Sequence, residues 1–125
     1  MAKLLVVHHT PSPATQELLE AVLAGARDDA ITGVEVVAVP ALVAGPIDVL
    51  EADGYLLATP ANIGYISGAL KHFFDTVYYP VLEATKDRPF AAYVHGSLGT
   101  EGAVRAIETI TTGLGWRQVA KVVTV

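Results

Sequence analysis

Three hydroxyl side chains follow the first apolar segment of the chain and stand directly before a helical pattern. The segment LLVV ends at two histidines, and Thr10, Ser12 and Thr15 come next, interleaved with two prolines. The first turn of a helix presents free N–H groups and the positive end of the helix dipole, so hydroxyls placed there can hold an anion such as a phosphate ester. The loop contains no lysine or arginine, so a phosphate would be held by hydrogen bonds and the dipole.

The same residues also suit helix capping. Ser12 is a favourable N-cap, and Pro13 is a favourable first helical residue. Capping alone and phosphate binding are compatible, and the sequence leaves both open. The glycine-rich dinucleotide fingerprint and the Walker loop with its lysine are both absent.

A second turn-rich loop follows the apolar segment GYLLAT. Pro60, Asn62 and Gly64 form this loop, and we expect Tyr65 to lie in it rather than in a strand. An aromatic ring in that place could cover a flat ligand or pack on the surface. Ser67 is expected to open or cap the helix that follows.

A third loop, HGSLGTEG (residues 95–102), carries three glycines. Glycine lets the backbone approach a ligand closely or adopt a positive φ, although an ordinary flexible turn would have the same composition. Three loops of this kind, each after an apolar segment, favour one shared ligand site.

The segments between these loops alternate between strand and helix patterns. Continuous apolar runs predict strands buried on both faces, and stripes of helical period predict amphipathic helices. The pattern indicates a doubly wound α/β fold with a five-stranded parallel sheet, in which ligands bind at the carboxyl ends of the strands. We expect strands over residues 4–7, 34–39, 54–60, 89–96 and 118–125, and helices over 18–26, 70–81 and 103–114, with at most a short helix over 48–52.

Composition narrows the class of protein. The chain has 125 residues, which fits a single domain over residues 1–125, and 52% of them are hydrophobic. It has no cysteine, which excludes disulfides, thiolate catalysis and cysteine-ligated metal sites. The net charge of −5 and the lack of a basic patch argue against nucleic acid as a partner. No run is long enough for a membrane span, and a cytoplasmic location is expected.

Together these residues resemble the flavodoxin-like FMN proteins, and more closely the branch of NADPH-dependent FMN reductases and NAD(P)H:quinone oxidoreductases. TPSPAT (residues 10–15) is similar to the phosphate loop S/T-x-S/T-G-x-T of that family, with Pro13 in place of its glycine. The family pattern P-x-x-x-G followed by S-G-x-L-K-x-F-x-D is matched at Pro60, Gly64, Ser67, Gly68, Leu70, Lys71, Phe73 and Asp75.

The resemblance implies FMN as cofactor and a sheet with strand order 2-1-3-4-5. Members of the family normally continue into a C-terminal helix, whereas this sequence stops at the fifth expected strand. Without that helix part of an apolar sheet face would be exposed, so we expect either that a tail is missing or deleted or that another chain covers the face. The cofactor-binding residues that it implies are, for the phosphate, Thr10, Ser12, Ala14 and Thr15; for the ribityl chain and ring, Pro60, Ala61, Asn62, Ile63, Gly64 and Tyr65; and for the other edge of the ring, His95, Gly96, Ser97, Gly99 and Gly102.

The implied function is an FMN-dependent oxidoreductase that passes electrons from NAD(P)H to a quinone or another small acceptor. The alternatives are a flavodoxin-like binding or scaffold module that has lost FMN, and an electron-carrier flavodoxin. A homodimer or homotetramer is expected because many relatives build the active site at a subunit interface. The sequence leaves open which acceptor is used and whether NADH or NADPH is the donor.

Other side chains suggest structural roles. His8 and His9 are adjacent on a strand and point to opposite faces, so they do not suggest a metal site. Lys71 and Asp75 are spaced for an ion pair along one helix, and Trp116 is expected to be packed. We assign no catalytic side chain and no metal ligand.

Overall fold

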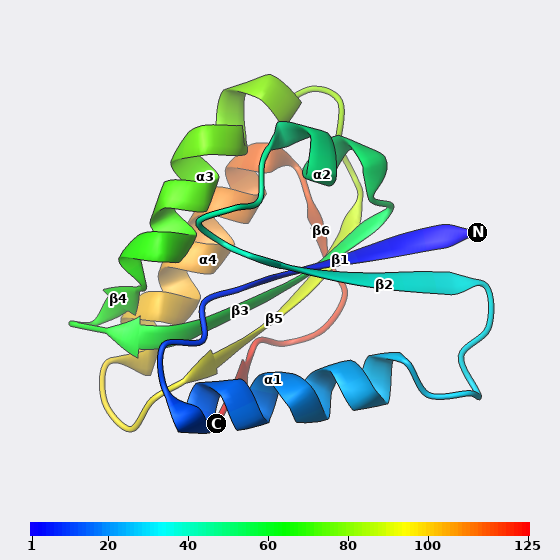
Figure 1. Ribbon diagram of the computed structural model, residues 1–125. Coiled ribbons are helices and arrows are strands. Elements are labelled where there is room, and N and C mark those ends of the chain that lie inside the picture. The colour runs from blue at the N-terminus through cyan, green and yellow to red at the C-terminus, as the bar shows by residue number, and fades with distance from the viewer.

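The computed structural model describes all residues, 1–125, as a parallel sheet covered by helices on both faces (Figure 1). The strands lie in the order β2-β1-β3-β5-β6, and β7 also pairs with β5, so the predicted order 2-1-3-4-5 is confirmed, with β6 and β7 together in the place of the fifth strand. The elements are β1 (Ala2–His8), α1 (Pro13–Ala26), β2 (Val34–Pro40), α2 (Pro46–Glu51), β3 (Gly54–Asn62), β4 (Tyr65–Ile66), α3 (Gly68–Val81), β5 (Pro89–His95), α4 (Thr100–Leu114), β6 (Arg117–Gln118) and β7 (Val123–Thr124).

The two faces of the sheet are covered unequally. Helices α2, α3 and α4 lie on one face and α1 alone lies on the other (Figure 1). Because successive strand residues point to opposite faces, Val7, Leu57 and Val94 face the three-helix side, where they join the main hydrophobic core. Helix α3 buries six residues in that core, whereas α1 buries only Thr15 and Leu19.

The face under α1 is apolar and only partly covered at the beginning of the strands. Two cavities of about 330 and 190 Å³ lie there, and they share Leu4, Gly54 and Pro89 in their lining. Leu56 and Ala91, which alternate with core residues, contribute to the smaller cavity. No helix follows β7 in residues 1–125.

The predicted last strand over residues 118–125 is wrong as a continuous element. Gln118 pairs with Phe90 and Val123 pairs with Tyr93, so five steps along the last segment are matched by three steps along β5. Two extra residues therefore bulge out between β6 and β7, where the Gln118 side chain donates a hydrogen bond to the Ala120 carbonyl at 3.1 Å. Both short strands remain in register with β5.

Tyr65 is also placed differently from the prediction, because it lies in a strand. β3 continues to Asn62, and β4 returns against it, with Asn62 opposite Tyr65 and Ala61 opposite Ile66. The chain reverses at Ile63 and Gly64, which both have positive φ, of 51° and 71°. This is the geometry of a two-residue hairpin turn, which was not predicted from the sequence.

None of the helices combines the length and the apolar character that crossing a membrane requires.

Candidate functional site

Three loops at the carboxyl ends of β1, β3 and β5 meet at one edge of the sheet, as the sequence predicts. The strand register sets His8 beside Ala58, and Pro60 beside His95. The His9 N–H donates to the Ala58 carbonyl at 3.1 Å, so the first loop starts against the second. A Cβ atom added to Gly96 would lie 3.1 Å from the Ala61 Cβ, so the second and third loops are in direct contact.

The loop between β1 and α1 forms a helix cap. The Ser12 hydroxyl accepts a hydrogen bond from the Thr15 N–H at 3.2 Å, and the Thr15 hydroxyl accepts one from the Ser12 N–H at 3.1 Å. The two hydroxyl oxygens are 2.9 Å apart, and Thr15 is only 5% exposed. This reciprocal arrangement is a capping box, so the capping interpretation is confirmed.

The electrostatics of this loop are those of a helix end without a full positive charge. Ala14 stands at the second helical position, and its N–H has no partner within the protein. The Thr10 hydroxyl lies 3.3 Å from Nδ1 of His8. Burial, and next the neighbouring His9, lower the pKa of His8, so its imidazole is uncharged at neutral pH. An anion here would be met by hydroxyls, the N–H group and the dipole.

The hairpin tip is strained and exposed. Ile63 has a φ of 51° and a fully solvent-exposed side chain, although a branched residue pays a steric penalty in the left-handed region. Strained residues of this kind concentrate at functional sites, where the surrounding structure holds them in place. Asn62 and Gly64, which flank Ile63, are also exposed.

Glycines hold the hairpin against the loop that precedes α4. Gly99 has a φ of 74°, as the sequence allowed, and a Cβ added to it would come within 2.9 Å of the Gly64 Cα. A Cβ on Gly102 would overlap the Gly64 carbonyl oxygen. The sequence suggested that these glycines let the backbone approach a ligand closely. In the structure Gly99 and Gly102 instead allow the two loops to approach each other.

The base of the hairpin is fixed by buried hydroxyls. The Ser67 N–H donates to the Thr59 hydroxyl at 3.1 Å, and the Thr59 hydroxyl donates to the Pro60 carbonyl at 2.8 Å. The Ser67 hydroxyl in turn accepts from the Leu70 N–H at 3.1 Å, which confirms Ser67 as the cap of α3. Thr59 was missed by the sequence analysis, because a threonine inside an apolar strand carries no separate signal.

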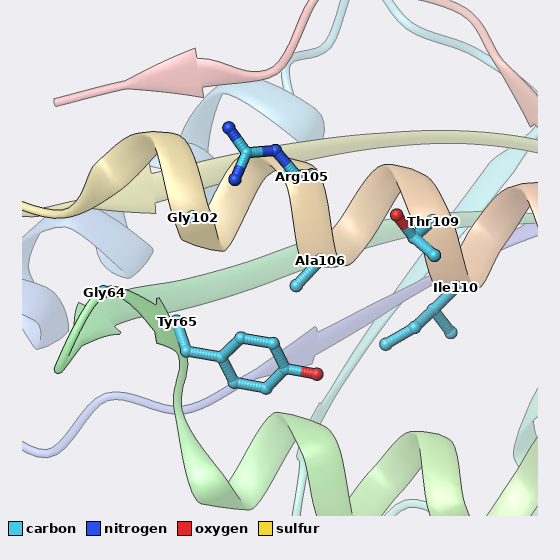
Figure 2. A pocket seen from close by; sticks show the side chains of 7 residues that line it. All are labelled: Gly64, Tyr65, Gly102, Arg105, Ala106, Thr109 and Ile110. Atoms are coloured by element: carbon cyan, nitrogen blue, oxygen red, sulfur yellow. The ribbon is translucent and has the colours of Figure 1, made fainter.

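Beside the hairpin lies a cavity of about 300 Å³ between β4 and α4 (Figure 2). The Tyr65 ring extends along α4 toward Ile110 and Ala106, on the far side of the hairpin from α1. Tyr65 is 41% exposed. The aromatic ring therefore lines the α4 side of the hairpin.

On α3, the Lys71 ammonium pairs with Asp75 at 2.7 Å, as predicted from their spacing.

The third loop exposes its tip to solvent and buries a polar atom at its start. Gly96 and Ser97 follow the end of β5, and the Gly96 N–H donates to the Val125 carbonyl at 3.1 Å. Ser97 and Leu98 are exposed, whereas Nδ1 of His95 is buried without a hydrogen-bond partner. Tyr93, two residues earlier on the same face, has a buried hydroxyl that also lacks a partner. Sequence analysis missed Tyr93, since an aromatic inside a strand is most simply a core residue.

These residues fit the FMN that the resemblance implies. The start of α1 offers a free N–H and three hydroxyls suited to a phosphate, and the two loops beside it are packed together at the strand ends. The buried Nδ1 of His95 is a polar atom that the protein itself leaves unsatisfied. Two prolines in the first loop remove N–H donors, so hydroxyl groups would have to supply a larger share of the hydrogen bonds to a bound phosphate.

Comparison with known proteins gives the same assignment. A flavodoxin from Aquifex aeolicus is 39% identical over 77 residues, which are 62% of this chain and 40% of that protein. The chain therefore spans less than half of the length of this curated relative.

Solved structures share the fold at low sequence identity. A WrbA-like flavodoxin from Agrobacterium tumefaciens superimposes with a TM-score of 0.71 at 21% identity, over 93% of this chain and 75% of that one. The apo form of the NADH:FMN oxidoreductase EMOB superimposes with a TM-score of 0.76 at 20% identity, over 99% of this chain and 75% of that one.

Residues 47–125, well over half of the chain, match the family described as NADPH-dependent FMN reductase. This segment contains the hairpin, the third loop and the four elements α3, β5, α4 and β6 that hold them. The chain thus belongs to the NADPH-dependent FMN reductase family, a family of flavin-dependent oxidoreductases whose cofactor is FMN.

Proposed function

We propose that this chain binds FMN across its three loops and acts as an oxidoreductase that takes electrons from NAD(P)H and delivers them to a quinone or another small acceptor. The observation that carries the proposal is the meeting of the capped helix start with the glycine-clamped loops at one sheet edge, in a chain of this family. FMN, when bound, supplies the redox chemistry, since it can accept a hydride from a nicotinamide and pass electrons onward.

In this proposal the start of α1 holds the phosphate. The Thr15 hydroxyl lies 3.0 Å from the Ser12 carbonyl and can donate to it, which leaves the Ser12 proton free for an anion without a change in the backbone. The Thr15 hydroxyl would exchange that bond for one to the anion. Thr10 and the Ala14 N–H complete this set. The helix dipole favours the negative charge, and the lack of a lysine or arginine leaves the affinity dependent on these hydrogen bonds.

The two clamped loops position the flavin ring. The segment Pro60 to Gly64 and the segment from His95 to Gly102 are packed against each other at the same edge of the sheet, so a planar ring that lies against this edge contacts both of them. The exposed tip at Ile63 leaves the outer edge of such a site open to a donor or an acceptor. No side chain is required to act as an acid or base, because the flavin carries the reaction.

A module of the same fold that has lost FMN is the second candidate. Its supporting observation is that the Ser12 and Thr15 hydroxyls already satisfy each other, while Pro11 and Pro13 offer no N–H. The two candidates are separated by titrating the purified protein with FMN and following flavin fluorescence. Saturable binding at micromolar concentration or tighter, followed by NAD(P)H oxidation with a quinone, supports the oxidoreductase. No binding at saturating FMN supports the module.

We also propose that the chain forms a homodimer or homotetramer. Tyr79 is 81% exposed on α3 and packs edge-on against Tyr78, with ring centroids 5.3 Å apart. Exposed aromatics of this kind are enriched at protein interfaces. Light scattering coupled to size exclusion measures the mass directly, and a monomer at all concentrations would refute the proposal.

The Thr15→Ala variant tests the phosphate assignment. Loss of this hydroxyl should weaken FMN binding by about 1 kcal/mol, which is roughly fivefold in the dissociation constant, because a hydrogen bond to a charged group is lost. The variant should also lose about 1 kcal/mol of unfolding free energy through the broken cap. Flavin fluorescence and urea unfolding measure the two effects separately.

Thr112→Ala on the exposed surface of α4 is the matched control and should change neither quantity by more than a few tenths of a kcal/mol. If Thr15→Ala lowered stability and left the FMN dissociation constant unchanged, the residue would be a cap and nothing more.

A further inference from the structure

Two buried side-chain polar atoms in the protein lack a hydrogen-bond partner, and both belong to β5. They are the Tyr93 hydroxyl and Nδ1 of His95. Tyr93 is only 7% exposed. A buried hydroxyl without a partner destabilises a protein, and phenylalanine would fill the same space without that cost. An unpaired buried hydroxyl therefore requires an explanation, and a ligand is one.

Both side chains point to the face of the sheet that α1 covers. They are two residues apart on a strand, so they share a face, and Val94 between them points into the core on the opposite side. The register sets Tyr93 level with Ala58, and Ala58 level with His8. His8 lies 3.3 Å from the Thr10 hydroxyl, so this row of side chains leads into the first loop.

The start of α1 lies over the same end of this face. The helix begins at Pro13, directly after the carboxyl end of β1, and runs back along the sheet (Figure 1). Its two buried residues, Thr15 and Leu19, belong to the first half of the helix, so that half is the part seated on the sheet. The unpartnered Ala14 N–H and the two unpartnered side-chain atoms of β5 thus belong to the same end of the molecule.

The chemistry of these groups matches what the first loop lacks. A phosphate monoester is bound by several donors at once, and this loop has no cationic side chain and two prolines. A phenol donates one hydrogen bond, and an imidazole nitrogen donates in the appropriate tautomer. Burial raises the pKa of Tyr93 to about 12, so the phenol keeps its proton at neutral pH and serves as a donor.

We propose that the Tyr93 hydroxyl and Nδ1 of His95 form the inner wall of the anion site at the start of α1 and donate hydrogen bonds to the phosphate of the bound flavin. The inference rests on the proposed function and deepens it by naming the donors that replace a cationic side chain. Tyr93 and His95 are binding residues in this proposal and take no part in the redox chemistry.

The experiment compares FMN with riboflavin, which lacks the phosphate, on the wild type and on Tyr93→Phe. The expected result is that Tyr93→Phe binds FMN about tenfold more weakly and binds riboflavin as the wild type does. The melting temperature of the flavin-free variant should be equal to or above that of the wild type, because an unsatisfied buried hydroxyl has been removed. His95→Leu should weaken FMN binding similarly, and His95→Asn, which keeps a donor near the Nδ1 position, should restore part of it.

Tyr55→Phe is the matched control. The Tyr55 hydroxyl is buried but donates to the Val49 carbonyl at 2.7 Å, so its loss should lower the melting temperature and leave FMN binding unchanged. If the wild type prefers FMN over riboflavin and both Tyr93→Phe and His95→Leu keep that preference, this inference is overturned and the proposed function stands. If the wild type binds neither flavin, or binds both equally, the proposed phosphate site fails and this inference fails with it.

Discussion

Replacement of Gly102 by alanine should weaken FMN binding at least tenfold. Gly102 lies in the first turn of α4, where an added methyl group would overlap the carbonyl oxygen of Gly64. The obstacle is backbone and cannot rotate aside, so the hairpin tip must move away from the loop that precedes α4. The two segments that are proposed to hold the flavin ring would then separate, and shifts of about 1 Å in such a site are costly.

Two measurements follow the change. Flavin fluorescence gives the dissociation constant for FMN, and hydrogen exchange reports the amides of the Ala61–Ile66 pairing, which should exchange faster in the variant. The second readout does not depend on the cofactor, so it tests the clamp even without flavin. If the exchange rates of these hairpin amides were unchanged, the contact between Gly64 and Gly102 would not be what holds the hairpin in place.

Gly25→Ala is the matched control because it is also a helical glycine. An added Cβ at Gly25 meets no atom within 4 Å. Alanine is preferred over glycine in a helix by up to about 1 kcal/mol, so this variant should be slightly stabilised and should bind FMN normally. Opposite outcomes at the two positions would separate steric overlap from helix propensity, which favours alanine in both.

The parallel sheet between helices was predictable from the sequence pattern because its central strands are largely buried, whereas the strand order came from the family resemblance. A run such as LLVV or GYLLAT must be apolar throughout to lie between two helical layers, and that requirement leaves a pattern that needs no knowledge of the partners. The last strand carried a similar pattern, yet it is split, because its bulge is set by the register of Gln118 and Val123 against β5. Register depends on both paired strands, so the sequence of one strand alone does not determine it.

The site was predictable as far as its loops and no further. The roles of Ser12, Thr15 and the glycines after the strands followed from local chemistry: the structure joins Ser12 and Thr15 in one helix cap and packs Gly99 and Gly102 closely against the hairpin. The hairpin was missed because the usual Asn-Gly turn signal is interrupted by Ile63, a residue that rarely adopts a positive φ. The unpaired hydroxyl of Tyr93 could not be predicted from sequence, because it depends on whether any segment packed around it places a hydrogen-bond partner within reach.

The largest effect on stability is expected from Arg88→Met, at the opposite end of β5 from the site. One guanidinium nitrogen of Arg88 lies within hydrogen-bonding distance of the carbonyls of Val49, Leu50 and Ala52, at 3.2, 2.9 and 2.8 Å, and of the Tyr55 hydroxyl, at 3.2 Å, so its two hydrogens are shared among these acceptors. These carbonyls lie at the C-terminal end of α2, where a cation also interacts favourably with the negative end of the helix dipole. The arginine therefore ties α2 to the starts of β3 and β5.

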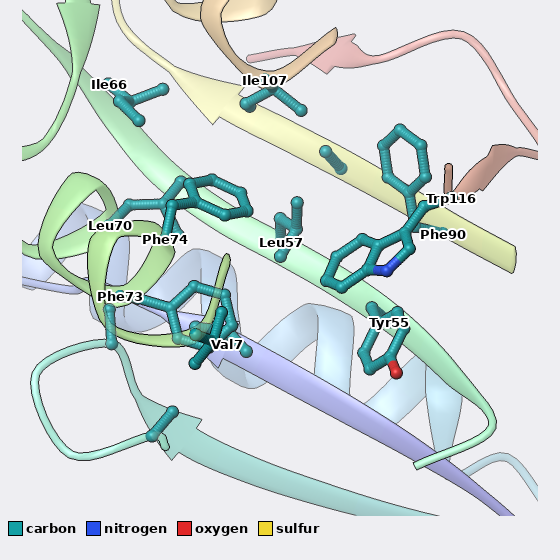
Figure 3. Close-up of a cluster of buried hydrophobic side chains, with 14 of the residues drawn as sticks. Val7, Tyr55, Leu57, Ile66, Leu70, Phe73, Phe74, Phe90, Ile107 and Trp116 are labelled. Atoms are coloured by element: carbon teal, nitrogen blue, oxygen red, sulfur yellow. The ribbon is translucent and has the colours of Figure 1, made fainter. Parts of the chain in front are cut away.

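The surroundings of Arg88 explain why its loss would spread. The Tyr55 ring stacks on Trp116 with centroids 4.0 Å apart (Figure 3), and the Trp116 indole N–H donates to the Thr85 hydroxyl at 2.9 Å. Trp116 is therefore packed, as the sequence predicted. Removing the guanidinium should take the side-chain donor from the Leu50 and Ala52 carbonyls, while the Val49 carbonyl keeps the Tyr55 hydroxyl, and should lower the unfolding free energy by about 2–3 kcal/mol. Urea unfolding followed by the single tryptophan measures this loss directly.

Arg27→Met provides the comparison, because Arg27 makes one exposed hydrogen bond, to the Val36 carbonyl at 3.2 Å, and its loss should cost at most about 0.5 kcal/mol. Arg88 and His95 are separated by the length of β5, roughly 20 Å, so folded Arg88→Met should bind FMN with the affinity of the wild type. A stability loss no larger than that of Arg27→Met would mean that water replaces the guanidinium at the end of α2. A changed FMN affinity would instead mean that the start of β5 controls the geometry of the loops at its end.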